Sequence, residues 1–394
     1  MKTYCHLVPF VAAALVACGS TTATIDVDAR PDFAGTLEAL VHRPDGTQVS
    51  RVPIAGASLE LPIEDGDTVT VVVHDGVWLA MRSYTGVDRG DTLTAVTWSS
   101  AELHSVPLVL PDEPRADGWE VNTPYGWLEP DSNYMIDVPV GATTTPIIAV
   151  GSSGVDVVGV YGSRAAPITS SGVAISENIA WKPTTVAISG VTEDDTAFAY
   201  GALAIGEDYL SIPSYDNVVP VPTTLADTIE VGALAYVIAT RTLLRSSAIS
   251  RAAPADNLAF DLSVPALPVV TDVQITSSTA RWTATGGGDF DVVDVLLSGE
   301  TYDWHIAASG GTTEIRMPTM PTDLAPPGAM TSRVRVEDLS DYDGYHAFIG
   351  YTGPRDDVER RLFRSVRADQ TSMLAATSPR RALPPNAIVA GAER

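Results

Sequence analysis

Cysteine is the residue type in this 394-residue chain whose position suggests covalent chemistry. The chain has two cysteines, Cys5 and Cys18, and both lie near its start. Residues 1–3 form a short basic head, and residues 7–17 (LVPFVAAALVA) carry no charge, which is the composition of an export signal. The apolar run is too short to cross a bilayer, since a spanning helix takes about 20 apolar residues. We therefore expect residues 1–17 to be removed as a signal peptide.

The four residues that end this segment, Leu15, Val16, Ala17 and Cys18, resemble the lipobox of bacterial lipoproteins. The resemblance implies a type II signal peptide, in which the Cys18 thiol is joined to diacylglycerol before the chain is cut ahead of it. Residues 18–23 would then be the lipidated cysteine and a short tether. After cleavage Cys18 has no partner for an intramolecular disulfide, which favours a separate chemical role. A soluble secreted form with a free thiol is the alternative.

Patterns of catalytic residues are sparse in the remaining chain. It contains no His-Glu-x-x-His, no Gly-x-Ser-x-Gly and no phosphate-binding glycine loop. An acidic pair is uninformative among 49 acidic residues, because a glycosidase needs two carboxyl groups facing each other across a cleft. The histidines after the signal lack the i, i+2 or i, i+4 spacing of zinc ligands: His42, His74, His104, His305 and His346. We expect a non-enzyme with no catalytic residue, and a hydrolase whose acids lie in the middle of the chain is the alternative.

An acidic turn over residues 338–344 (DLSDYDG) is the best candidate for a metal site. When its glycine is aligned to that of a calcium-binding loop, Asp341 and Asp343 occupy ligand positions. However, Leu339 stands at the first ligand position and Gly350 at the twelfth, where a bidentate glutamate belongs. We therefore predict no bound metal and no cofactor.

The charge balance limits the possible partners. The chain has 24 Lys and Arg against 49 Asp and Glu, a formal net charge of −25. Such a field repels nucleic acid and anionic membrane surfaces. We expect no nucleic-acid partner, membrane contact through the lipid anchor, and a glycan or an envelope protein as the possible ligand.

The elements that must position these residues are predicted from the period of the apolar residues. Strict alternation indicates half-buried strands at three places: Leu59, Leu61 and Ile63; Val69, Val71 and Val73; and Phe260, Leu262 and Val264. The 31 Gly and 28 Pro fall largely between such segments, where they favour turns. We predict an all-β chain of two or three antiparallel β-sandwiches in tandem, followed by a short C-terminal helix and tail.

Residues 24–110 are predicted to form the first sandwich. Asp-Gly and Gly-Asp turns at 44–46, 64–67 and 88–91 separate its strand segments. This order of strands and turns resembles the carboxypeptidase-regulatory-like, transthyretin-related sandwiches of bacterial surface proteins. The resemblance implies a fold and a surface context, and it supplies no catalytic residue.

Residues 115–265 are predicted to form a second sandwich. It opens with three aromatic residues, Trp119, Tyr125 and Trp127, whose flat apolar faces could form a platform for sugar rings. The alternative, which we favour, is that these aromatics pack in the core or at the edge of the sandwich.

Residues 268–353 show the clearest alternation and are predicted to form seven strands. Ala280, Trp282 and Ala284 face one side, and a closing strand is expected over 345–351. The pattern resembles a fibronectin type III domain, with Trp282 in the place of the early core tryptophan. The family is a spacer and binding scaffold, so the resemblance implies fold and context without chemistry.

The last predicted segment, 354–394, differs in composition. Val358, Leu362 and Val366 are four residues apart, with acids before and arginines after, which favours a short amphipathic helix over 356–368. The residues beyond it are expected to form a tail. An Arg-rich helix could contact a partner, and a solvated terminal helix is the alternative.

Together these features predict a lipid-anchored envelope lipoprotein that binds, displays or spaces something without catalysing a reaction. Gly19, directly after the cysteine, favours the outer membrane. The alternative function is a structural or accessory subunit of an envelope complex, with the sandwiches as a rigid stalk.

Overall fold

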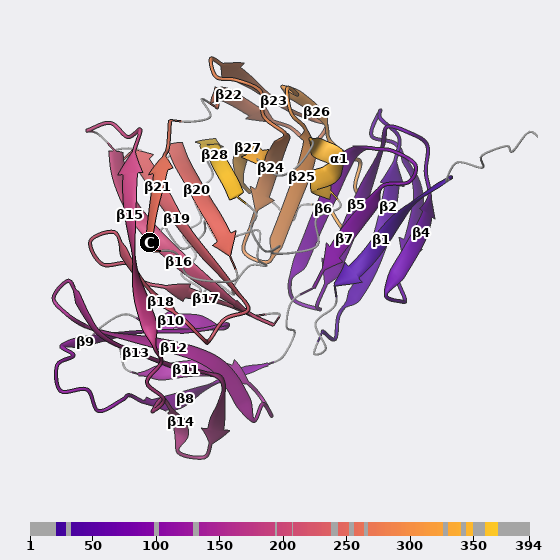
Figure 1. The fold of residues 1–394 in the computed structure, drawn as a ribbon. Helices are drawn as coiled ribbons and strands as arrows, with labels where there is room; N and C mark the ends of the chain where they lie inside the picture. The colour runs from indigo at the N-terminus through magenta and orange to yellow at the C-terminus, as the bar shows by residue number, and fades with distance from the viewer. Residues whose placement is uncertain are drawn as a thin grey trace, which may run out of the picture.

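The computed structural model describes residues 21–28, 33–97, 102–128, 134–193, 195–206, 208–237, 243–251, 256–263, 267–325, 330–339, 344–349 and 359–368. Nearly all of the regular secondary structure in these residues is β-strand, and the strands stack into several sandwich-like pairs of sheets (Figure 1). The all-β sandwich prediction is therefore confirmed. Four groups of strands can be distinguished, and we call them units 1 to 4.

Unit 1 packs two sheets face to face, in the orders β4-β1-β7 and β3-β2-β5-β6. Its strands form where apolar residues alternate, so that Ala23 and Ile25 of β1 face the core while their neighbours do not. The bounds are β1 Thr22–Asp28, β2 Thr36–His42, β3 Gln48–Pro53, β4 Ser58–Pro62, β5 Asp67–His74, β6 Leu79–Val87 and β7 Thr92–Val96.

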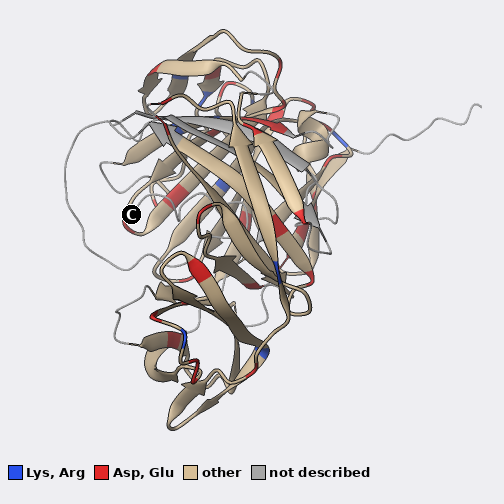
Figure 2. Cartoon of the chain, turned by 60° about the vertical axis from the view of Figure 1, so that its left-hand side comes forward, with Lys and Arg blue, Asp and Glu red and all other residues tan. Residues whose placement is uncertain are grey.

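Unit 2 lies at the bottom of the molecule in Figure 1 and, because the turn is about the vertical axis, in Figure 2 as well. Its strands run in the order β10-β9-β12-β13-β14-β8-β11 and fold over so that both halves share one core. The bounds are β8 Leu103–Val109, β9 Gly118–Thr123, β10 Gly126–Leu128, β11 Met135–Pro139, β12 Thr144–Ser153, β13 Asp156–Thr169 and β14 Gly172–Ala174.

Unit 3 again has two sheets, in the orders β18-β15-β21 and β17-β16-β19-β20. Its core includes Phe260 and Leu262, two of the residues whose alternation predicted a strand. The bounds are β15 Trp181–Ser189, β16 Asp195–Ile205, β17 Asp208–Ile212, β18 Val218–Pro222, β19 Thr228–Val237, β20 Leu243–Arg251 and β21 Asn257–Asp261.

Unit 4 places β22-β23-β26 in one sheet and β25-β24-β27-β28 in the other. Trp282 is buried in its core, as its alternation with Arg281 and Thr283 suggested. The bounds are β22 Val269–Ile275, β23 Thr279–Thr285, β24 Val292–Ser298, β25 Tyr302–Ser309, β26 Glu314–Arg316, β27 Thr331–Leu339, α1 Tyr345–Ile349 and β28 Glu359–Ala368.

Units 1, 2 and 3 share one strand order. In each unit the first strand lies between the fourth and the seventh, and it pairs in parallel with the seventh. The other four strands run third, second, fifth, sixth. The same seven-strand topology is thus built three times in succession, although the sequence suggested only one module of this kind.

One twelve-stranded sheet connects units 1, 4 and 3. Its order is β17-β16-β19-β20-β28-β27-β24-β25-β6-β5-β2-β3. Strand β25 of unit 4 pairs in parallel with β6 of unit 1, and β28 of unit 4 pairs with β20 of unit 3. Unit 4 therefore joins the sixth strands of two other units, and their backbone ladders run on without a break.

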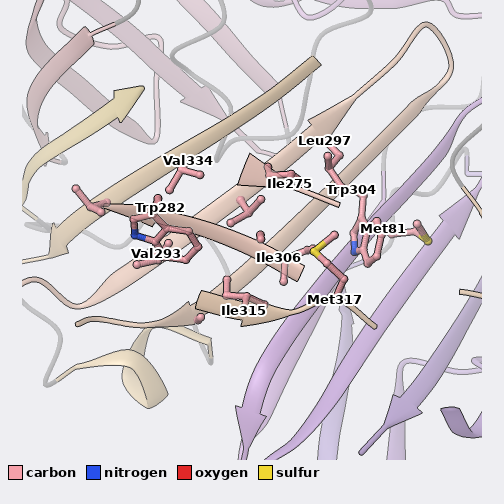
Figure 3. Packing of buried hydrophobic residues seen from close by; sticks show 14 of the residues in the cluster. Met81, Ile275, Trp282, Val293, Leu297, Trp304, Ile306, Ile315, Met317 and Val334 are labelled. Carbon is pink, nitrogen blue, oxygen red and sulfur yellow. The ribbon is translucent and has the colours of Figure 1, made fainter. Parts of the chain in front are cut away.

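The sheet between units 1 and 4 is buried on both faces. Alternate residues of β5, such as Val69 and Val71, face the core of unit 1, and the intervening Val72 faces the core of unit 4. Met81 of β6 also packs in the core of unit 4, beside Trp304 (Figure 3). Alternation predicted that β5 would be half-buried, and it is fully buried because a second unit covers its outer face.

The C-terminal elements differ from the prediction. Residues 345–349, expected to belong to a closing strand, form the short helix α1, and three of its side chains enter the core of unit 1. The helix expected over 356–368 is wrong, because residues 359–368 form β28 in the middle of the large sheet. β28 has hydrogen-bonding neighbours on both sides, and a strand satisfies those ladders where a helix would not.

The four strand groups begin and end at other residues than the predicted modules. Strand β8, which falls within the predicted 24–110 module, pairs with β11 and β14 of unit 2. The strands of the predicted 115–265 module belong to two units, 2 and 3. The predicted 268–353 module contains six of the seven strands of unit 4. The seventh strand, β28, lies beyond residue 353.

Removing β28 should separate units 3 and 4. A chain ending at residue 355 loses the ladders to β20 and β27, and unpaired buried backbone groups cost about 1–3 kcal/mol each. A chain ending at residue 368 keeps β28 and serves as the matched control. We expect a lower Tm and a larger radius of gyration by small-angle X-ray scattering for the shorter chain alone. Equal values for the two chains would contradict the central position of β28.

Candidate functional site

Trp119, the first residue of the predicted aromatic platform, lies in the core of unit 2. It is 7% exposed and contacts Tyr161 edge to face, with ring centroids 5.5 Å apart. Gly151 on the neighbouring strand leaves room for the ring, since a Cβ there would lie 3.1 Å from it. The platform prediction is therefore wrong for Trp119, and the alternative of core packing describes it.

Trp127 and Trp119 lie on opposite faces of their sheet. Trp127 of β10 pairs with Asn122, which is three residues after Trp119 on β9, and successive residues of a strand alternate in face. Trp127 is 41% exposed, and Tyr125 lies in the turn between the strands, where its amide donates to Thr123. The three aromatics do not form one surface, so a ring-stacking site would rest on Trp127 alone.

The exposed apolar side chains of the described residues concentrate in unit 2. Five of the eight large hydrophobic residues that are exposed belong to it: Val109, Trp127, Met135, Val140 and Val155. Large apolar groups on a surface mark interaction sites when they are contiguous rather than scattered. Two of these five lie on one sheet face.

That face is the outer side of β14-β8-β11. Pro107 pairs directly with Met135, and Val109 pairs with Ala174, so four apolar side chains lie on adjacent strands. Met135 is 42% exposed. Residues of opposite parity, among them Val106 and Leu108, fill the core beneath. We call Pro107, Val109, Met135 and Ala174 the outer face of unit 2.

A glycine turn and a polar pair border the outer face. Gly172 begins β14 with φ of 108°, and a Cβ at this position would lie 2.0 Å from the Pro107 carbonyl oxygen. Only glycine therefore allows β14 to approach β8 so closely. At the other end the Ser105 hydroxyl donates to Asp137 at 2.6 Å. The face is consequently a flat apolar strip with a polar margin.

The opposite side of unit 2 is covered by unit 3. Ile148, Val150 and Val160 of unit 2 are buried in the core of unit 3. The hydroxyl of Tyr215 donates to Glu120 at 2.8 Å, and burial together with that carboxylate raises the pKa of Tyr215. This apolar contact fixes unit 2, and since a sandwich has two sides, it leaves the outer face turned away from the rest of the protein.

An ion pair across the same contact fixes the orientation of unit 2 further. Arg164 of β13 donates to both carboxylate oxygens of Asp227, at 2.8 and 2.7 Å. The amide of Gly206 donates to the same carboxylate, and these contacts lower the pKa of Asp227. Both bonds come from one guanidinium nitrogen of Arg164, and the pair is half-exposed, so it adds a modest attraction to the apolar contact.

A second cluster of chemically interesting groups lies where units 1 and 4 meet. Asp294 is 4% exposed, and its Oδ2 lies 3.1 Å from both His305 Nδ1 and Arg335. Arg82 of β6 lies over the rings of Tyr84 and Phe348, at 5.5 and 5.6 Å from their centroids. Charged or titratable groups from four strands, β6, β24, β25 and β27, thus meet beside the core of unit 1, and the helix α1 adds the ring of Phe348.

This cluster can hold charge but has the character of a structural ion network. Burial alone would raise the pKa of Asp294, but the charges of His305 and Arg335 outweigh it and hold that pKa well below its usual range. The carboxylate therefore stays ionised and paired. Its Oδ2 makes these contacts, while Oδ1 is buried without a hydrogen-bond partner. A carboxylate that stays ionised is a poor general acid.

The predicted lipidation site and part of the acidic turn cannot be placed in the structure. Cys18 lies outside the described residues, as do Asp341 and Asp343 of the acidic turn. Among the residues described, no group of three His, Cys, Asp or Glu could hold a metal ion. Within that same part of the chain, no helix has the length and apolar character of a membrane span.

The chain was compared with known proteins. No family model matches it, and no curated protein matches it.

The outer face was missed by sequence reasoning for a definite reason. Residues 106–109 of β8 form a continuous run of Val, Pro, Leu and Val, which has no period of two. Such a run can be buried on both sides or exposed on one. The signal that was available is Met135 in β11, whose alternation with Ile136 places one of the two outside.

Replacing Asp294 with Asn should destabilise the protein by about 3 kcal/mol, because Arg335 and Arg82 lose a buried carboxylate and keep Glu337 as a nearby opposite charge. The folded-state pKa of Asp294 is depressed, so its contribution is present above pH of about 4 and is lost as the pH falls further. The difference in unfolding free energy between wild type and D294N, measured with urea, should therefore shrink in acid.

Glu314→Gln is the matched control, because its pair with Arg281 is exposed and should contribute less than about 1 kcal/mol. A D294N difference that stays constant from about pH 6 to pH 2 would contradict the ionised pair.

Proposed function

We propose that this chain is a lipid-anchored lipoprotein of the outer membrane that displays a binding surface and catalyses no reaction. The outer face of unit 2 is the observation that carries the proposal. It is apolar, it lies on the side of unit 2 opposite its contact with unit 3, and regular strands hold it flat.

The twelve-stranded sheet of units 1, 3 and 4 supports a display role. Twelve strands from three units share one sheet, so unit 3, to which unit 2 is fixed, cannot turn independently of units 1 and 4. A continuous backbone ladder is stiffer than modules joined by linkers alone. The same rigidity would serve a structural or accessory subunit of an envelope complex, which is the second candidate.

Strand order supports the family resemblances in this proposal. Units 1 to 3 repeat one order, fourth-first-seventh over third-second-fifth-sixth, which is compatible with the transthyretin-related resemblance proposed for residues 24–110. Unit 4 has seven strands in two packed sheets, the general architecture that fibronectin type III domains share, with the first, second and fifth strands against the rest. Both resemblances describe scaffolds, which host functions without specifying one.

Ligand chemistry favours a protein over a glycan. A sugar platform needs several exposed aromatic faces, and Trp119 is buried while Trp127 stands apart from it. The outer face instead offers aliphatic side chains and a methionine, which suits an apolar protein surface.

Electrostatics supports the absence of catalysis. A glycosidase acid has a raised pKa, produced by burial or by a second carboxylate. Among the described carboxyl groups with a clear shift, the pKa is lowered in each case by arginine, histidine or hydrogen-bond donors: Asp45, Glu113, Asp227, Asp261, Asp294 and Asp323.

A photo-crosslinker should capture the partner at the outer face. With p-benzoylphenylalanine in place of Met135, we expect a discrete adduct in intact cells, and Val109→Glu should abolish it by placing a charge in the contact. Val77, exposed on unit 1, is the control site and should give no such adduct. Surface substitutions of this kind change stability by less than about 0.5 kcal/mol. Equal adducts at 135 and 77 would contradict the assignment.

Lipidation has its own test. Cells grown with an alkyne fatty acid should label the wild-type protein and leave Cys18→Ala unlabelled, because the thiol is the attachment point. Serine at position 20 provides a control, since Ser20→Ala should keep the label. Label retained in the Cys18 variant would overturn the anchor, and protease treatment of whole cells would show on which side the protein lies.

A further inference from the structure

The first described strand begins very close to the proposed anchor. β1 starts at Thr22, four residues after Cys18, and it is the middle strand of its sheet. The carbonyl of Thr22 accepts a hydrogen bond from Gly90 at 2.8 Å, and Thr22 pairs with Pro62. The chain is therefore held by strands on both sides from its first strand residue.

This leaves little freedom between lipid and protein. Four residues reach at most about 14 Å when fully extended. Two turns lie at the end of unit 1 where β1 begins: residues 63–66 follow the partner of Thr22 on β4, and residues 88–91 contact β1 directly. We call this the turn end of unit 1.

We infer that the protein, once acylated at Cys18, stands on a phospholipid surface with the turn end of unit 1 against the headgroups and unit 2 farthest from them. The inference rests on the proposed lipidation. It adds an orientation that lipidation alone does not imply, since a long tether would leave the protein free to tumble.

The charge of the turn end determines how it meets the surface. Glu64, Asp65 and Asp88 are exposed there, against Arg89 and the partly exposed Arg43, and His346 lies 2.9 Å from Asp91. An acidic end does not adhere to anionic lipid. Acidic residues also lie on strands and turns throughout the view of Figure 2. The short tether, rather than attraction, holds this end at a zwitterionic surface such as phosphatidylcholine.

The orientation explains the placing of the outer face. In Figure 1, β1 begins at the upper right, and β8 and β14 lie at the bottom, below the strands of unit 3. With the turn end on the membrane, the outer face of unit 2 points away from it. An apolar face held away from the bilayer is available to a protein partner and does not sink into lipid.

Energy transfer to the membrane tests the inference. The chain 18–394, made without its signal, has Cys18 as its sole cysteine and can be coupled to maleimide-bearing lipid in phosphatidylcholine vesicles that contain an acceptor-labelled lipid. A donor dye is attached through an azide-bearing amino acid at Arg89 (turn end), Ala57 (opposite end of unit 1) or Met135 (outer face).

We expect transfer to fall in the order 89, 57, 135, because β1 alone separates the first two sites by about 20 Å at 3.3 Å per residue. Transfer at residue 89 should be about twofold that at residue 135 or more. Equal or reversed transfer would overturn the orientation. Because coupling is chemical, this result is independent of whether cells acylate Cys18.

A longer tether is the decisive control. Inserting about twelve Gly and Ser residues after Gly19 gives the tether an r.m.s. end-to-end distance of roughly 20 Å, about the separation of sites 89 and 57. The difference in energy transfer between these two sites should then largely vanish. If the difference persisted, adhesion of a protein surface and not the tether would set the orientation. Sedimentation of uncoupled protein with phosphatidylglycerol vesicles would likewise count against the inference.

Discussion

The architecture depends on the pairing of edge strands by unit 4. A sandwich of the kind built in units 1 and 3 ends one of its sheets on its sixth strand, whose outer backbone groups need partners. Strand β25 supplies them for β6, and β28 supplies them for β20. In unit 2 the long strand β13 pairs instead with β14 of its own unit. The pairing of these edge strands therefore decides which units join into the large sheet and which unit remains outside it.

Fusion changes the chemistry of the shared strands. Once both faces of β5 and β6 are covered, their polar residues must find partners, and they do so across the contact. Ser83 accepts a hydrogen bond from the indole of Trp304 at 2.8 Å and bonds Thr70 at 2.7 Å. At the surface, Arg51 of β3 adds an exposed ion pair to Asp323 of unit 4 at 2.8 Å. These bonds convert a contact between units into a specific register.

The one unit outside the large sheet carries the exposed apolar face, and this follows from the same logic. Units 1 and 3 use their outer sheet surfaces or edges to join unit 4, so the apolar residues at those contacts are covered. Unit 2 is attached through one sheet only, by Ile148, Val150 and Val160. Its other sheet is left to solvent, where Met135 and Val109 remain available for a partner.

The sequence by itself determined the fold class, the strands with strict alternation and the burial of Trp282, because a period of two and glycine-rich turns are local properties. It could not determine which side of a strand is covered. A ligand platform at Trp119 therefore stayed possible until the structure showed that this side of β9 faces the core of unit 2. The sequence also could not separate helix from strand at 359–368, because a spacing of four between apolar residues such as Leu362 and Val366 fits the period of a helix and is also a multiple of two. Only the presence of β20 and β27 on either side, each requiring backbone partners, makes this segment a strand.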